Sequence, residues 1–372
     1  EVPLDLIERM ESLVAKNLVY TEERAGTMRF RMYATIQEYA TQRAVENGMH
    51  GSLAENHGIC FLRLAEQLWP TLRGREAINS YERLDHELDN LRQALAWALE
   101  NAPALGLRIV LALGEYWDTR GMPDEQIQWT DAVLKKLPQG DPVPTAIARM
   151  ELARAAFRRS DLERFAVLTK EVSDAAAELG NTYLIVDALM RRGKLAAYGM
   201  GTDDIVPLMQ EGLAMSKRSG YTIATIEFLH NLAAVANFRG RPAEAVALSD
   251  EGLELATRLG ATRWEAISYA IRGFAQLSLG QLDASDESLN AALRCCKRFM
   301  DHAQVIYPLL GKAQLALARG ATAVGVELMG AVERFCERKG TTIIPAVLQL
   351  VSLSQNTMKA QIGEAAYTRL RG

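Results

Sequence analysis

The chain has 372 residues, of which 49% are hydrophobic and 24% charged, and its formal net charge is −4. This composition is that of a globular protein, and no apolar run approaches the roughly 20 residues that a membrane-spanning helix needs. The weakly acidic balance gives no bulk electrostatic pull toward nucleic acid, whose binders usually carry a concentrated basic face. We therefore expect no direct contact with nucleic acid, and we expect none with a membrane.

The four cysteines form no disulfide framework, and the first residues carry no signal-peptide pattern. We therefore expect a cytoplasmic protein. Because the chain runs from its first residue, which is not Met, straight into an amphipathic pattern, we also expect it to be part of a longer protein.

Residues 4–47 predict a helix, a hairpin and a second helix. Apolar side chains recur at helical spacing from Leu4 to Val14, two short extended runs flank a turn containing Gly26, and Ile36 and Tyr39 share one helical face. A two-stranded hairpin can bury its apolar face only against such helices. We interpret residues 1–49 as a partial winged-helix unit, with a small α+β cap as the alternative.

From residue 50 onward strand signals nearly vanish. Residues 50–100 predict a helical connector, whose clearest helix carries leucines from Leu84 to Leu99 along one stripe. Residues 341–372 are expected to form C-terminal capping helices. Between these segments, residues 101–340 contain an internal repeat.

Glycines mark this repeat at multiples of 40 residues and again at the half-period, which is typical of paired helices that end on a residue with positive φ. A column of small residues follows the same period, and a second small column lies twelve residues later. This double column is typical of tetratricopeptide units rather than HEAT repeats. The fold class is therefore mainly all-α, a tetratricopeptide-like superhelix of six units. The ladder is Gly140, Gly180, Gly220, Gly260 and Gly340 with Gly240, Gly280 and Gly320 between, and the columns are Ala153, Gly193, Ala233, Gly273 and Ala313, then Ala245, Ser285 and Gly325.

Two segments resemble bacterial signal-transduction ATPases with numerous domains, which include LuxR-type and antibiotic-regulator-type transcription factors. Residues 29–40, RFRMYATIQEYA, resemble a stretch of their winged helix, and residues 84–99, LDHELDNLRQALAWAL, resemble the segment that follows it. The resemblance implies a P-loop nucleotide-binding domain before this region, a repeat sensor here, and often a DNA-binding domain after it.

The chain itself contains no phosphate-binding G-x-x-x-x-G-K-[ST] motif, no zinc-protease helix and no nucleophile elbow. We expect no enzyme activity, no cofactor and no metal. Stacked repeats usually bind partners along their concave face, which the first helix of each unit lines. The register places a cationic, polar and aromatic set on this predicted groove: Arg154, Phe157, Arg158, Asp187, Lys194, Tyr198, His230, Asn237, Phe238, Phe274 and Tyr307.

These observations predict a sensor or protein-interaction module of a transcriptional regulator. A protein or small effector would occupy the groove, and its binding would be relayed to the nucleotide-binding domain outside this chain. Arg154, Arg158 and Lys194 would form a cationic wall for an acidic ligand. The alternative is a constitutive scaffold or a module for self-association that switches nothing.

Overall fold

The structure is a computed structural model that describes residues 4–24, 27–137, 140–197, 200, 204–299, 304–339 and 345–371. The chain divides into two compact units, Glu1–Cys60 and Phe61–Gly372. Within the described residues, no helix combines the length and the apolar character needed to cross a bilayer.

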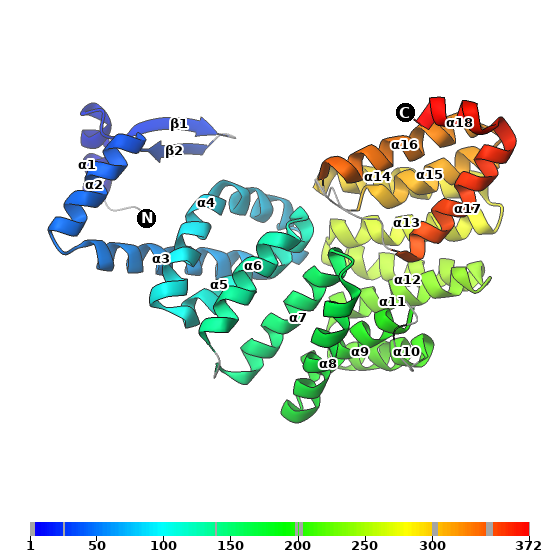
Figure 1. Ribbon diagram of the computed structural model, residues 1–372, viewed down its shortest axis with the longest axis horizontal. Coiled ribbons are helices and arrows are strands. Elements are labelled where there is room, and N and C mark those ends of the chain that lie inside the picture. The colour runs from blue at the N-terminus through cyan, green and yellow to red at the C-terminus, as the bar shows by residue number, and fades with distance from the viewer. Residues whose placement is uncertain are drawn as a thin grey trace. The chain divides into compact units, whose positions relative to one another are not determined.

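The first unit has the expected order of helix, hairpin and helix (Figure 1). The two strands pair antiparallel, with Phe30 opposite Thr21. Gly26, the expected turn residue, lies outside the described residues. The elements are α1 (Leu4–Ala15), β1 (Tyr20–Arg24), β2 (Thr27–Arg31), α2 (Ala34–Glu46) and the beginning of α3 (His50–Leu68).

The expectation that the hairpin buries its apolar face against these helices is wrong. Met28 and Phe30 are 59% and 50% exposed, and Tyr39 on α2 is 62% exposed. Among the residues of this unit whose burial is described, Val19 is the only hydrophobic side chain that is fully buried. A segment of this size buries too little surface to close a core of its own.

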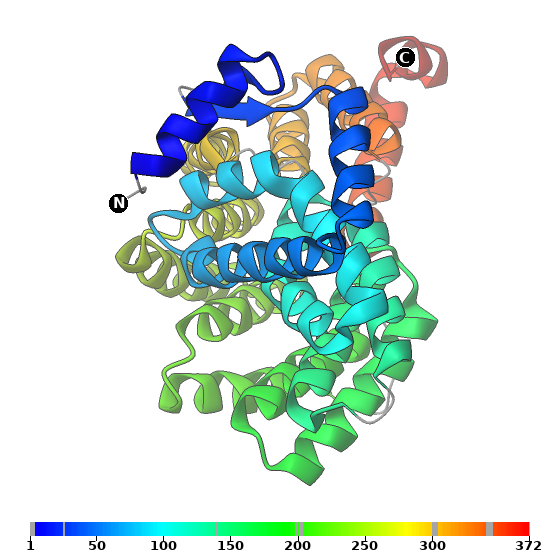
Figure 2. The ribbon, with the colours of Figure 1, turned by 90° about the vertical axis from the view of Figure 1, so that its left-hand side faces the viewer.

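The second unit is helical throughout its described residues. It begins with the end of α3, the 3₁₀ helix η1 (Trp69–Arg73) and α4 (Ala77–Asn101), and it then forms six consecutive helix pairs. The pairs stack side by side and bend into a curved array (Figure 2). They are α5 (Pro103–Arg120) with α6 (Pro123–Lys136), α7 (Pro142–Arg158) with α8 (Leu162–Leu179), α9 (Thr182–Ala197) with α10 (Ile205–Arg218), α11 (Thr222–Phe238) with α12 (Pro242–Leu259), α13 (Thr262–Ser278) with α14 (Leu282–Phe299), and α15 (Ile306–Ala318) with α16 (Thr322–Lys339).

The two small-residue columns meet inside the pairs, which confirms the tetratricopeptide-like superhelix. Ser285 Oγ on α14 donates a 2.8 Å hydrogen bond to the Gly273 carbonyl oxygen on α13. A Cβ atom at Gly325 would lie 2.9 Å from a backbone oxygen of α15, so only a glycine permits this approach. Ala233 and Ala245 are both fully buried in one cluster.

Most glycines of the ladder end a helix with a φ between 58° and 76°, as the sequence predicted. Gly140 differs, because it precedes the Asp141 cap of α7, whose carboxylate accepts a hydrogen bond from the Val143 amide at 3.2 Å. Ser160 takes a ladder position without being glycine and has a φ of 57°. Gly340 lies outside the described residues.

The array ends in two further helices, α17 (Pro345–Ile362) and α18 (Glu364–Arg371). Met358 on α17 and Tyr367 on α18 are buried in one cluster with Met329 of α16. These helices therefore cover apolar surface of the last pair.

Candidate functional site: a buried ionic network that closes the array

Helix α5 carries two carboxylates in a stretch that is otherwise apolar. Glu115 and Asp118 are 3% and 5% exposed, and they are flanked by the fully buried Leu113, Tyr116 and Trp117. Residues three apart lie on one face of a helix, so both carboxylates point the same way. Buried charges of this kind need partners.

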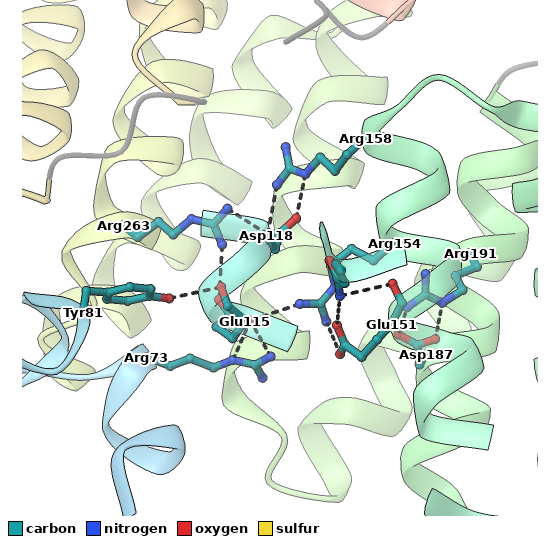
Figure 3. Close-up of polar contacts among 11 residues, drawn as sticks. Arg73, Tyr81, Glu115, Asp118, Glu151, Arg154, Arg158, Asp187, Arg191 and Arg263 are labelled. Atoms are coloured by element: carbon teal, nitrogen blue, oxygen red, sulfur yellow. Dashed lines mark hydrogen bonds and ion pairs between the residues drawn. The ribbon is translucent and has the colours of Figure 1, made fainter. Parts of the chain in front are cut away.

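Glu115 accepts hydrogen bonds from three arginines that come from three different elements (Figure 3). Arg73 of η1 lies 2.7 Å from Oε2, Arg154 of α7 lies 3.1 Å from the same oxygen, and Arg263 of α13 lies 3.2 Å from Oε1. The hydroxyl of the buried Tyr81 donates a longer bond, of 3.4 Å, to the Glu115 backbone oxygen.

Asp118 continues the network. It accepts two hydrogen bonds from Arg158, at 2.7 and 3.1 Å, and one from Arg263, at 3.0 Å. Arg263 is therefore shared by both carboxylates of α5, although it follows them by 148 and 145 residues in the chain. Its side chain is only 6% exposed.

The contacts of Arg263 close the array on itself, because they join the first helix pair to the fifth. Apolar contacts support the closure: the rings of Tyr81 on α4 and Phe299 on α14 meet edge to face, with 5.2 Å between their centroids. A Cβ atom at Gly260 would come 2.1 Å from the Arg75 side chain, so the turn before α13 lies directly against the chain that leads into α4. We name Arg73, Glu115, Asp118, Arg154, Arg158 and Arg263 the ionic clasp.

A second group of charges extends the clasp along α7 and α9. Glu151 lies 3.2 Å from Arg154 and accepts a hydrogen bond of the same length from Gln126. A Cβ atom at Gly114 would lie 2.7 Å from the Glu151 carboxylate, so this glycine leaves space for the buried acid beside α5. On α9, Arg191 forms a two-point ion pair with Asp187 (Figure 3).

The surroundings lower the pKa values of Glu115 and Asp118 and raise that of Glu151. Burial tends to raise the pKa of Glu115, but Arg73, Arg154 and Arg263 outweigh burial and lower it to about 2. Asp118 likewise has its pKa held well below the usual range, because Arg158, Arg263 and Arg154 outweigh burial. For Glu151 burial dominates and raises the pKa. Both carboxylates of the clasp are thus ionised across the neutral range.

Two residues of the predicted cationic wall belong to the clasp. We expected Arg154 and Arg158 to be available to an outside acid, but both guanidinium groups pair with carboxylates of α5. The sequence register could not reveal this, since the acids belong to another helix pair. Asp187, a third predicted residue, is paired with Arg191.

Phe157 on α7 and Lys194 on α9, both predicted groove residues, lie together. The Lys194 ammonium lies 5.5 Å from the centroid of the Phe157 ring, and that ring packs at 5.0 Å against Phe165. Within the described chain, Lys194 makes no hydrogen bond and no ion pair. It is therefore the cation of the predicted wall that keeps a free amine.

The other predicted groove residues occupy varied positions. His230 is buried, hydrogen-bonded to Ser268 at 2.7 Å and stacked on Trp264, and burial lowers its pKa to about 3. Phe238 is 69% exposed, whereas Phe274 packs against the core of the last repeats. The remaining members are Asn237, whose buried Oδ1 has no partner in the described structure, Tyr307, which lies near Arg158, and Tyr198, which is outside the described residues.

Sequence reasoning missed the acids of the clasp and two of its arginines. A signal for Glu115 and Asp118 was present, because two acids interrupt a long apolar helix at a spacing that puts them on one face. Arg73 and Arg263 carried no such signal, since their partners lie far away in the sequence. Among the described residues, no three His, Cys, Asp or Glu side chains lie together as a metal site would require.

No protein-family model matches the chain. It is 26% identical over 232 residues to proteins named as helix-turn-helix-type transcriptional regulators from Mycobacterium bovis and Mycobacterium tuberculosis, a match that covers 61% of this chain and 22% of theirs. The matched part of the chain thus spans about a fifth of the length of these relatives.

The fold is also similar to a solved structure. The crystal structure of a signal-transduction ATPase with numerous domains and a tetratricopeptide repeat sensor, from Pyrococcus horikoshii, superimposes with a TM-score of 0.50 and 14% identity. The match covers 97% of this chain and 60% of that one. By name, the sequence relatives are transcriptional regulators and the structural neighbour is a signal-transduction ATPase.

Proposed function

We propose that this chain is the non-catalytic sensor module of a transcriptional regulator. An effector or partner protein binds on the inner face of the repeats, and this binding is relayed to a nucleotide-binding domain outside the chain. The observation that carries the proposal is the ionic clasp. It joins α13 to α5 through one arginine and two carboxylates, and it is the polar part of a closure that apolar contacts also support.

Such a clasp is suited to an array that can exist in a closed and an open state. Charges desolvated inside a protein add little net stability when paired, yet they are costly to leave unpaired, so a competing ligand can shift the balance between a closed and an open array. A ligand that binds the open array better than the closed one would favour opening in proportion to that difference in affinity.

The exposed apolar side chains of the first unit support the second half of the proposal. Met28, Phe30 and Tyr39 are each at least half exposed, and another domain often covers such apolar side chains in a larger protein. We assign the nucleotide-binding domain to this surface. The name of the structural neighbour, a signal-transduction ATPase, is consistent with that partner.

The test is made in the full-length protein and compares Arg263→Gln with Lys217→Gln. Lys217 pairs with Glu251 at an exposed position outside the clasp, so its variant controls for the loss of one positive charge. A sensor module requires that Arg263→Gln change the rate of nucleotide hydrolysis or the oligomeric state, while Lys217→Gln leaves both unchanged.

A constitutive scaffold gives another outcome. If Arg263→Gln opens the array in small-angle scattering but leaves nucleotide turnover and oligomeric state as in the wild type, the repeats do not regulate the nucleotide domain. The relay would then be excluded and the scaffold function favoured.

A further inference from the structure

The two carboxylates of α5 form a site for one guanidinium group, and in this structure Arg263 fills it. Its two terminal nitrogens reach different acids: Nη1 lies 3.2 Å from Glu115 Oε1, and Nη2 lies 3.0 Å from Asp118 Oδ2 (Figure 3). A planar guanidinium can bridge two carboxylates in this way, whereas a lysine ammonium is a single point charge. We name the oxygens Glu115 Oε1 and Asp118 Oδ2 the guanidinium slot.

The slot depends on Arg263 for a donor. Arg73 and Arg154 both donate to the other oxygen of Glu115, so within the described residues Oε1 accepts its hydrogen bond from Arg263 alone. The Glu115 side chain is only 3% exposed. If Arg263 leaves, this carboxylate oxygen therefore needs another donor, either water or a ligand.

Arg263 reaches the slot across the seam at which the array closes. On one side of this seam lie Leu72 of η1 and Ala77 of α4, and on the other side lie Trp264 of α13 and Phe299 of α14. Opening of the array would carry Arg263 away together with Trp264 and Phe299. The slot would then be uncovered, with Leu72 and Ala77 as apolar neighbours.

We propose that the guanidinium slot is an effector site, which a ligand with a guanidinium group occupies in place of Arg263. This inference rests on the proposed sensor function and names its effector class. The ligand carries the same charge and the same fork of donors as the group that it replaces, so it makes the same charge-assisted hydrogen bonds. An apolar part of the ligand would lie against Leu72 and Ala77.

The direction of the response follows from competition. Arg263 fills the slot in the closed array, so the ligand binds only the open array and shifts the population toward it. Because Arg263 is tethered to the slot through the rest of the array, its effective concentration there is about millimolar or higher. A simple guanidinium compound should therefore compete only at roughly tens of millimolar.

The first experiment removes the Arg263 side chain and supplies it in solution. In the 372-residue chain, Arg263→Ala should lower the melting temperature, and ethylguanidine at about 50 mM should restore about half of the loss or more. n-Propylamine carries an ammonium group instead, and at the same concentration it should restore almost nothing. Failure of ethylguanidine to restore stability, or equal restoration by n-propylamine, would overturn the inference.

Two controls locate the rescue. Arg108 forms a two-point pair with Glu66 at an exposed position outside the slot, so Arg108→Ala should gain no stability from ethylguanidine. Adding Asp118→Asn to Arg263→Ala removes one acid of the slot and should raise the concentration required by about tenfold. An equal gain by Arg108→Ala would reveal a general solvent effect and would refute the site.

The second experiment tests competition in the wild-type full-length protein, which does not depend on the folding of any variant. Ethylguanidine should change the rate of nucleotide hydrolysis in the same direction as Arg263→Gln does, and n-propylamine should leave the rate unchanged. A pentapeptide with a central arginine, compared with L-argininamide, distinguishes the two sources of a guanidinium group. A lower effective concentration of the peptide indicates a partner protein, and the reverse indicates a free compound.

The outcomes separate this inference from the sensor function. Rescue of Arg263→Ala without competition in the wild type would mean that the slot is only structural, and the effector class would then be wrong. If Arg263→Gln changes nucleotide turnover but ethylguanidine neither rescues nor competes, the sensor function stands and this inference alone fails.

Discussion

The ionic clasp predicts an order of stability among single substitutions. Arg263→Gln removes two charged contacts, of 3.2 and 3.0 Å, between α13 and α5. Hydrogen bonds to charged groups contribute roughly 1.5–3 kcal/mol each. Glu115 and Asp118 keep Arg73, Arg154 and Arg158 as partners, so we expect the total loss to be near the value for one such bond, about 2 kcal/mol.

Glu115→Gln should cost more than Arg263→Gln. It removes the charge on which three arginines converge, and Arg73 has no other ion pair in the described structure. Breaking a buried pair by removing one partner typically costs about 3–5 kcal/mol, because an uncompensated charge is left inside the protein. The free energy of unfolding, measured by urea titration followed through circular dichroism, should therefore fall further for Glu115→Gln.

The free energy of unfolding should fall as the pH is lowered. The folded-state pKa of Glu115 is about 2, below its ordinary value of 4.5, so its stabilising effect is fully present above pH 4.5 and is lost as pH falls toward 2. Asp118 acts in the same direction. Urea titrations between pH 5 and 2 should give a flatter profile for Glu115→Gln than for the wild type.

Two results would refute this reasoning. A loss of less than about 0.5 kcal/mol for Arg263→Gln, the range of an ordinary surface substitution, would mean that Arg263 does not hold α13 to α5 in solution. A pH profile of Glu115→Gln that is as steep as that of the wild type would mean that this carboxylate does not carry the acid sensitivity.

Three further predictions concern packing and the buried histidine. Gly212→Ala should lower stability by about 1–3 kcal/mol, because the new Cβ would lie 2.1 Å from the buried Phe228 ring; an unchanged melting temperature would show that the ring yields. Ala233→Leu should cost a similar amount, because Ala233 is fully buried between two helices, and calorimetric melting tests it. The pKa of His230 is lowered from 6.5 to about 3, so the neutral form stabilises the fold above pH 6.5 and this contribution is lost as pH falls toward 3. His230→Gln should therefore make the free energy of unfolding less dependent on pH between 6.5 and 3, and an unaltered pH dependence would argue against the burial of His230.

The local features of the fold could be predicted from the sequence, because each depends on residues that are close along the chain. Glycines at a fixed period end helices, and small residues twelve positions apart let paired helices touch, as Gly273 and Ser285 do. The same register brought Phe157 and Lys194 together, since they belong to neighbouring units. Repeats contact their neighbours, so a periodic sequence is enough to place such contacts.

The curvature of the array was decided only by the tertiary structure. Small rotations between successive pairs accumulate until α13 reaches α5, and no periodic pattern in the sequence encodes their sum. For this reason the partners of Arg154 and Arg158 and the role of Arg263 could not be predicted, although the sequence contains all of these residues. Helices and pairwise packing follow from local chemistry, whereas the clasp exists because distant charges must find partners once the curved array buries them.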